Sequence, residues 1–158
     1  MEDYDMKRIA SFCINHDVLT EGIYTSRIDG DVITYDIRMV RPNCGTYLST
    51  AAAHTFEHLF ATYVRNTEYS DEIVYVGPMG CRTGFYFLVR DTMAPETAIR
   101  LVQETMDFVL GFTGAIPGAE KAECGNYQDH DLDGAKEIAR KMKPVLADWT
   151  AEKLVYPE

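Results

Sequence analysis

The chain has 158 residues, 46% of them hydrophobic, and its formal net charge is −10, from 15 basic and 25 acidic residues. This size suits one domain with one core, over residues 1–158. The acidic balance disfavours phosphate backbones and anionic bilayers, so neither nucleic acid nor a membrane is expected as a partner. Because the sequence also lacks a signal peptide and the roughly 18 apolar residues of a membrane span, we expect a cytoplasmic protein.

The first predicted element is a hairpin. Residues 22–28 and 32–40 are rich in β-branched and aromatic side chains, which favour strands. Asp29 and Gly30 lie between them, and Asp-Gly is a common hairpin turn. Residues 41–47 then read as a loop.

A helix and a second hairpin follow. Residues 50–66 are predicted to be helical, because Ser49 or Thr50 can cap the first turn and three alanines favour this conformation. Residues 72–77 and 84–90 have the composition of two strands joined by a turn that contains glycine.

Two further helices are predicted in the second half. Residues 95–112 begin with Pro95, which suits a first helical turn. Residues 114–130 contain Gly, Pro and Asn and are expected to be irregular. A last helix is expected over about 132–149, bent or interrupted at Pro144.

The order of these elements predicts the fold class. Strands come in hairpins and are separated by helices, which favours an α+β domain with a mainly antiparallel sheet and helices packed on it. A doubly wound parallel sheet is the weaker alternative, since no Gly-rich phosphate loop follows any strand.

The helix at 50–66 carries the most informative motif, His54-Thr55-Phe56-Glu57-His58, an H-x-x-E-H pattern. A helix turns by about 100° per residue, so His54, Glu57 and His58 fall within an arc of about 100°. Two imidazoles one turn apart can bind a single metal ion. The alternative is a solvated polar face. The opposite side of the helix carries an apolar stripe that predicts its core contact: Phe56, Leu59, Phe60, Tyr63 and Val64.

Two histidines leave a metal site incomplete, because catalytic zinc-type sites commonly have three protein ligands. The candidates for the third are Cys124, Cys81, His16 and His130. The four cysteines include no C-x-x-C pair, which excludes a zinc ribbon, and a reducing cytosol disfavours disulfides. Free thiols are then available as ligands or catalysts, although either cysteine can equally be a small buried apolar side chain.

Several motifs, in order and over nearly the whole chain, resemble S-ribosylhomocysteine lyases, the LuxS family. They are Ser11-Phe12 with His16, residues 35–38 with 41–43, residues 54–59, residues 78–86, and Cys124-Gly125 with residues 130–132.

The resemblance implies a role for each of eight residues. His54, His58 and Cys124 are implied as metal ligands, and Cys81 and Glu57 as a general acid/base pair. The residues implied at the ribose end of the substrate are Ser11, His16 and Arg38.

The resemblance also implies a cofactor, a partner and a reaction. One divalent metal is expected per subunit, Fe(II) in the cell with zinc or cobalt as substitutes, in a homodimer whose active sites lie at the subunit interface. The substrate is the small molecule S-ribosylhomocysteine. Carbonyl migration and β-elimination convert it to homocysteine and dihydroxypentanedione, a quorum-sensing signal precursor, within the activated methyl cycle.

Two other functions compete with this one. An inverted-motif metallohydrolase would use Glu57 to activate water, but it leaves Cys81 without a task. A non-catalytic protein with a structural metal would have a closed site, with His130 or Cys81 as the fourth ligand.

Overall fold

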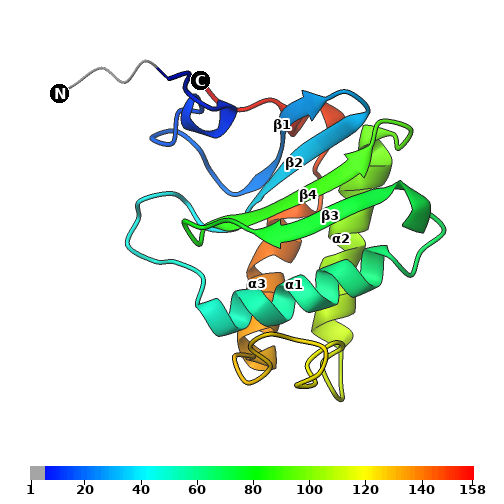
Figure 1. Ribbon diagram of the computed structural model, residues 1–158. Helices are drawn as coiled ribbons and strands as arrows, with labels where there is room; N and C mark the ends of the chain where they lie inside the picture. The colour runs from blue at the N-terminus through cyan, green and yellow to red at the C-terminus, as the bar shows by residue number, and fades with distance from the viewer. Residues whose placement is uncertain (1–5) are drawn as a thin grey trace.

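The computed structural model describes residues 6–158, which form a four-stranded sheet with helices on one of its faces (Figure 1). Every strand pairs antiparallel with its neighbours, in the order β1-β2-β4-β3. The strands are β1 (Gly22–Asp29), β2 (Val32–Arg38), β3 (Ile73–Pro78) and β4 (Gly84–Arg90). This architecture confirms the expected α+β class.

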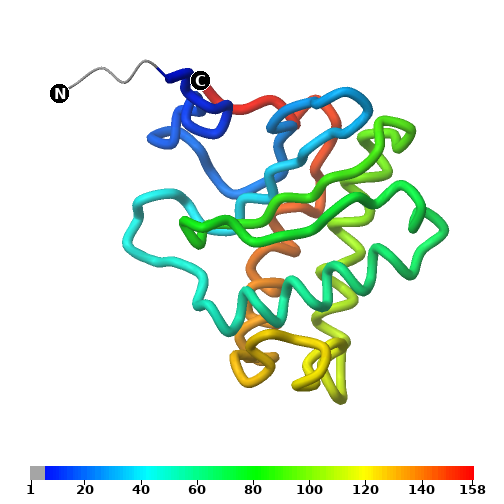
Figure 2. The backbone as a smooth tube through the Cα atoms, viewed as in Figure 1, coloured from blue at the N-terminus to red at the C-terminus, as the bar shows by residue number. Residues whose placement is uncertain are grey.

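The helices pack against one another and against the sheet, and the tube drawing shows how the chain alternates between the two layers (Figure 2). They are α1 (Thr50–Val64), α2 (Pro95–Gly111) and α3 (Leu132–Leu146). Short 3-10 turns lie at η1 (Ala10–Phe12), η2 (Ser70–Glu72) and η3 (Ala151–Leu154). Within residues 6–158, none of the helices combines the length and apolar character that crossing a bilayer requires.

The bounds of α1 follow from its cap and its apolar stripe. Ser49 accepts a hydrogen bond from the Ala52 backbone N–H at 3.2 Å, which confirms one of the two predicted caps. The stripe that includes Phe56 and Leu59 is buried in the core, as the helical wheel predicted. The histidine face of α1 therefore points away from the sheet, toward the segment between α2 and α3.

Strand β2 places two kinds of side chain on its two faces. Tyr35 and Ile37 point into the core beneath the helices, while Asp36 and Arg38 occupy the opposite face and are nevertheless buried. The C-terminal segment covers part of that face, since the Tyr156 hydroxyl donates a hydrogen bond to Asp36 Oδ2 at 2.7 Å.

The last helix tolerates its proline. Pro144 lies inside α3, which ends two residues later at Leu146. Pro144 cannot donate a hydrogen bond to the Arg140 carbonyl, but only two helical residues follow it, and α3 continues to Leu146 without interruption. The helix begins with Asp131 as its cap, whose side chain accepts from the Gly134 backbone N–H.

Candidate active site

Four side chains form a histidine–cysteine cluster: His54 and His58, one turn apart on α1, and Cys124 and His130 from the segment between α2 and α3. One ligand atom from each lies within 4.8 Å of all the others. The Cys124 Sγ atom is 3.4 Å from His54 Nε2, although the two residues are 70 positions apart. Three imidazoles and a thiol at this spacing are a donor set that suits zinc or ferrous iron.

Backbone carbonyls orient two of the imidazoles. The Nδ1 atom of His54 lies 2.8 Å from the Asp129 carbonyl oxygen, and that of His58 lies 2.7 Å from the Pro117 carbonyl oxygen. Because a carbonyl only accepts hydrogen bonds, each Nδ1 must carry the proton. The Nε2 lone pair of both rings is then free for a metal, the arrangement typical of metal-binding histidines.

A glycine lets the loop approach this close. Gly118 has a φ of +69°, and a Cβ atom there would lie 3.2 Å from His58 Nδ1. Any other residue would strain the backbone and crowd the imidazole. The segment between α2 and α3 is therefore shaped around the histidines.

His130 sits differently from the other two histidines. Its ring stacks on that of His54 with centroids 4.0 Å apart, and its Nδ1 atom lies 2.9 Å from the Thr55 hydroxyl. Its Nε2 atom is buried and has no partner among the described residues. Burial, followed by the nearby imidazoles of His54 and His58, lowers the pKa of His130.

A cavity of about 240 Å³ separates α1 from the turn between β3 and β4. His54 and Glu57 line it from the helix, and Met79 and Arg82 line it from the turn. Glu57 is half-buried and, with His54, faces this space. The cavity can hold a small polar substrate next to the histidine–cysteine cluster.

Residues 78–84, here named the thiol turn, carry Cys81 at the surface. Its Sγ atom is 3.1 Å from the Thr83 hydroxyl oxygen. Arg82 has a φ of +62°, unusual for a residue with a side chain, and marks how tightly the backbone bends. At Gly84 a Cβ atom would lie 2.2 Å from the Ile37 carbonyl oxygen, so only glycine lets β4 start this close to β2.

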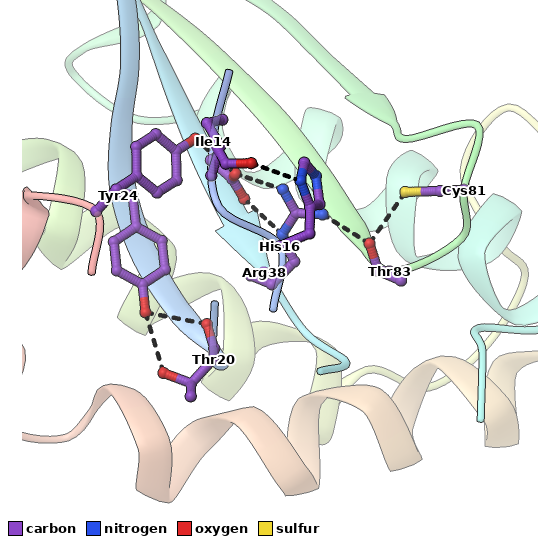
Figure 3. Close-up of polar contacts among 9 residues, drawn as sticks. Ile14, His16, Thr20, Tyr24, Arg38, Cys81 and Thr83 are labelled. Carbon is purple, nitrogen blue, oxygen red and sulfur yellow. Dashed lines mark hydrogen bonds and ion pairs between the residues drawn. The ribbon is translucent and has the colours of Figure 1, made fainter. Parts of the chain in front are cut away.

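Behind the thiol turn lies the buried Asp36–Arg38 ion pair. Figure 3 shows Arg38 connected to Thr83, and Thr83 to Cys81. The Arg38 guanidinium donates to both Asp36 oxygens, at 3.2 and 2.6 Å, and to the Thr83 hydroxyl at 2.7 Å. Burial alone would lower the pKa of Arg38, but the Asp36 carboxylate outweighs this and raises it. A chain of contacts therefore links the fixed positive charge to Cys81 through Thr83.

Two predicted substrate residues lie away from the cluster. Ser11 lines a second cavity, of about 410 Å³, together with Thr34 and Tyr86 on the sheet face opposite the helices. His16 is half-buried, with its Nδ1 atom 2.9 Å from the Ile14 carbonyl oxygen. The single chain thus places His54 and Glu57 on one cavity and Ser11 on another.

The sequence reasoning did not single out three residues that shape the site: Thr55, Thr83 and Tyr156. Thr55 and Thr83 are buried, and their hydroxyl groups contact His130 and Cys81, respectively. Strand alternation was a usable signal for the pairing of Asp36 with Arg38, because both lie on one face of β2. No local sequence pattern predicts the contact of Tyr156 with Asp36, because the two residues are 120 positions apart.

The four cysteines are free in the structure. This agrees with the expectation that disulfides are absent and leaves Cys81 and Cys124 available for chemistry. Cys13 and Cys44 are exposed and lie outside the histidine–cysteine cluster.

Together, the fold and the site define a class: a small α+β protein with a histidine–cysteine cluster beside a free thiol and a carboxylate. Comparison with known proteins narrows this class. The family model described as S-ribosylhomocysteinase (LuxS) matches residues 9–153, and the chain belongs to this family.

Curated relatives agree over almost their full length. The chain is 49% identical to an S-ribosylhomocysteine lyase of Phocaeicola vulgatus, covering 96% of this chain and 98% of that protein. It is 46% identical to the S-ribosylhomocysteine lyase of Clostridium beijerinckii, covering 96% and 99%. A lyase of the same name from Borrelia garinii is 45% identical, covering 96% and 100%.

Proposed function

We propose that this chain is an S-ribosylhomocysteine lyase that depends on a divalent metal. The observation that carries the proposal is the histidine–cysteine cluster beside Glu57 and the thiol turn, in a chain of the LuxS family. The substrate is a thioether attached to a sugar, and the products are homocysteine and dihydroxypentanedione. Among the described residues no contact favours the metallohydrolase alternative, which gives Cys81 no catalytic role.

His54, His58 and Cys124 hold the metal in this proposal. Their free Nε2 atoms and thiol support it, as does the spacing of their ligand atoms within 4.8 Å. When bound, the metal supplies Lewis-acid stabilisation of the negative charge that develops on the sugar oxygens. Fe(II) is the proposed physiological metal, and zinc or cobalt can substitute because the reaction requires no change of metal oxidation state.

Cys81 and Glu57 transfer the protons. The carbonyl must move along the sugar before β-elimination can expel the thiol, and each move takes a proton from one carbon and returns one to its neighbour. Two bases on different elements can serve successive carbons better than one. Glu57 lines the cavity from α1, while Cys81 projects from the thiol turn, where the Thr83 hydroxyl can donate to its thiolate.

The remaining substrate contacts involve Ser11, His16 and Arg38 at the ribose end. Arg38 is buried, so it acts from behind the thiol turn through Thr83. Ser11 faces a different cavity, which supports an arrangement in which it completes the site of a second subunit. We therefore propose a homodimer with active sites at the interface, which sedimentation would detect as twice the chain mass of 17.9 kDa.

The whole chain forms one cytoplasmic lyase domain in this proposal. Homocysteine release returns sulfur to the activated methyl cycle, and the second product is the precursor of a quorum-sensing autoinducer. Both roles follow from one bond cleavage.

The direct test is to incubate the metal-loaded protein with S-ribosylhomocysteine and to measure released homocysteine with a thiol reagent after protein removal. Time-dependent thiol release that stops on metal chelation and returns with Fe(II), Co(II) or zinc supports the proposal. A properly loaded dimer that releases no homocysteine would overturn it. Chain without substrate, and substrate with the Cys81→Ala variant, are the matched controls.

A further inference from the structure

His130 is the one member of the histidine–cysteine cluster whose role the proposed reaction leaves open. Its side chain has a ligand-type nitrogen within 4.8 Å of the other three residues. Two functions are chemically possible for its inward nitrogen, Nε2: a lone pair that binds metal, or an N–H that donates a hydrogen bond. The partner of the other nitrogen decides between them.

That partner is the Thr55 hydroxyl, and the hydroxyl is already an acceptor. The Asp131 backbone N–H donates to Thr55 Oγ1 at 2.8 Å. The hydroxyl proton of Thr55 then needs an acceptor of its own, and among the described residues His130 Nδ1, at 2.9 Å, is the atom placed to receive it. Because an Nδ1 atom that accepts carries no proton, the N–H of the His130 ring must sit on Nε2.

This protonation pattern is the reverse of that in His54 and His58. Those two rings face main-chain carbonyls through Nδ1, which keeps their Nε2 lone pairs free. His130 faces a hydroxyl that donates, which leaves an N–H at the inward position. The inward Nε2 is also buried and has no hydrogen-bond partner among the described residues, so its N–H is left unsatisfied beside the ligand atoms.

We propose that His130 is not a fourth metal ligand but a hydrogen-bond donor, whose Nε2–H binds an oxygen atom of the sugar, or of water, within the cluster. This role deepens the proposed lyase function and rests on it for the identity of the sugar. A fixed donor at this position stabilises negative charge on the oxygen as protons move along the sugar chain.

The first test needs no substrate and no variant. The chain contains only four histidines, so long-range proton–nitrogen NMR spectra of protein with ¹⁵N-labelled histidine can assign each tautomer. In the zinc-loaded protein we expect His130 to carry its proton on Nε2, and His54 and His58 to carry theirs on Nδ1. A proton on Nδ1 of His130, with zinc on Nε2, would overturn the proposal.

The second test separates a donor from a ligand and from a packing residue. Zinc affinity is measured by competition with a chelating dye. We expect His130→Phe to change the zinc affinity by less than about tenfold. The control His54→Phe should lower the zinc affinity by more than about a hundredfold. For kcat of homocysteine release, His130→Phe should lose about a hundredfold, and His130→Gln, which keeps an N–H, should lose clearly less. Equal losses in the two His130 variants, or none in His130→Phe, would refute a donor role.

The two proposals fail in different ways. If wild-type protein releases no homocysteine, the lyase function fails, while the tautomers and zinc affinities still decide whether His130 is a donor. If homocysteine is released but His130 carries zinc, the lyase function stands and the donor role fails.

Discussion

The two ends of the candidate site are stabilised in opposite ways. At the histidine–cysteine cluster, His54 and His58 are half-buried, and each ring donates a hydrogen bond to a main-chain carbonyl. At the thiol turn, Cys81 is exposed, yet Thr83 connects it to the fully buried Asp36–Arg38 pair. Because the support behind the thiol belongs to the core and the metal-binding face does not, we expect that metal binding can be lost without loss of the fold.

The largest expected effect comes from breaking the buried pair. Arg38→Ala leaves the Asp36 carboxylate buried without its guanidinium, and removal of one partner of a buried pair destabilises a protein by about 3–5 kcal/mol. Urea unfolding of the metal-free protein measures this. Arg27→Ala is the matched control, because its pair with Asp29 is exposed and should contribute nothing measurable. Equal stability of the two variants would contradict the expected difference between the buried and the exposed ion pair.

Removing a metal ligand should lower metal affinity and leave the stability of the metal-free chain unchanged. We expect Cys124→Ala, His54→Ala or His58→Ala to lower zinc affinity by more than about a hundredfold, since even residues behind a ligand alter affinity by about 10–100-fold. Urea unfolding of each metal-free variant should match that of the metal-free parent chain. Full metal occupancy in Cys124→Ala would exclude that residue from the site.

The acid/base pair should affect turnover alone. Cys81→Ala and Glu57→Gln are expected to keep bound metal and a folded dimer but to lose at least about a hundredfold in homocysteine release, the usual contribution of general acid/base catalysis. Cys44→Ala, at another exposed thiol, should retain full activity. Near-normal turnover in Cys81→Ala would return that residue to the role of a surface thiol.

A smaller effect is expected from changing Thr83, which connects the buried Arg38 to Cys81 in the thiol turn. Thr83→Val removes the hydroxyl between Arg38 and Cys81. One hydrogen bond to a charged group is worth about 1.5–3 kcal/mol. Because the Cys81 thiolate loses this bond in the variant, its alkylation by iodoacetamide at pH 7 should slow by about tenfold. Thr83→Ser keeps the hydroxyl and should restore the rate. A slow Thr83→Ser variant would show that the methyl group, not the hydrogen bond, matters.

The smallest effect concerns alkaline pH. Burial, then the charge of Asp36, raises the pKa of Tyr156 far above that of an unfolded tyrosine. The folded protein therefore holds this proton where the unfolded chain has released it, so the free energy of unfolding falls as pH rises above about 10. In urea titrations at several pH values, Tyr156→Phe should show a shallower decline than the parent chain. An unchanged slope would mean that Tyr156 does not contribute to it.

The elements could be predicted more fully than the site. Strand-favouring composition, turn residues and helix-capping signals predicted the strands and long helices of residues 6–158 to within a few residues, because these signals are local. The interruption considered at Pro144 did not occur, since the proline lies one turn or less from the helix end. The register shifts in β1 and β3 have no local signal and depend on pairing with neighbouring strands.

The site divides in the same manner. The His54–His58 spacing is a property of one helix and is visible in the sequence, whereas the approach of Cys124 and His130 depends on how the segment after α2 packs on α1. For Cys124 the family resemblance supplied what spacing could not. The role of Thr83 could not be seen in advance, because it arises from tertiary contacts with Arg38 and Cys81.

The carbonyl contacts of the ligand histidines have an evolutionary consequence. A main-chain oxygen belongs to whatever residue occupies positions 117 or 129, so point mutations there cannot delete the acceptor of His58 or His54. The loop can therefore accumulate substitutions while the ligand tautomers are inherited unchanged, provided that its backbone path and Gly118 persist. The orientation of His130 is not protected in this way. It depends on the side chain of Thr55, and a single base change in that codon can remove the hydroxyl.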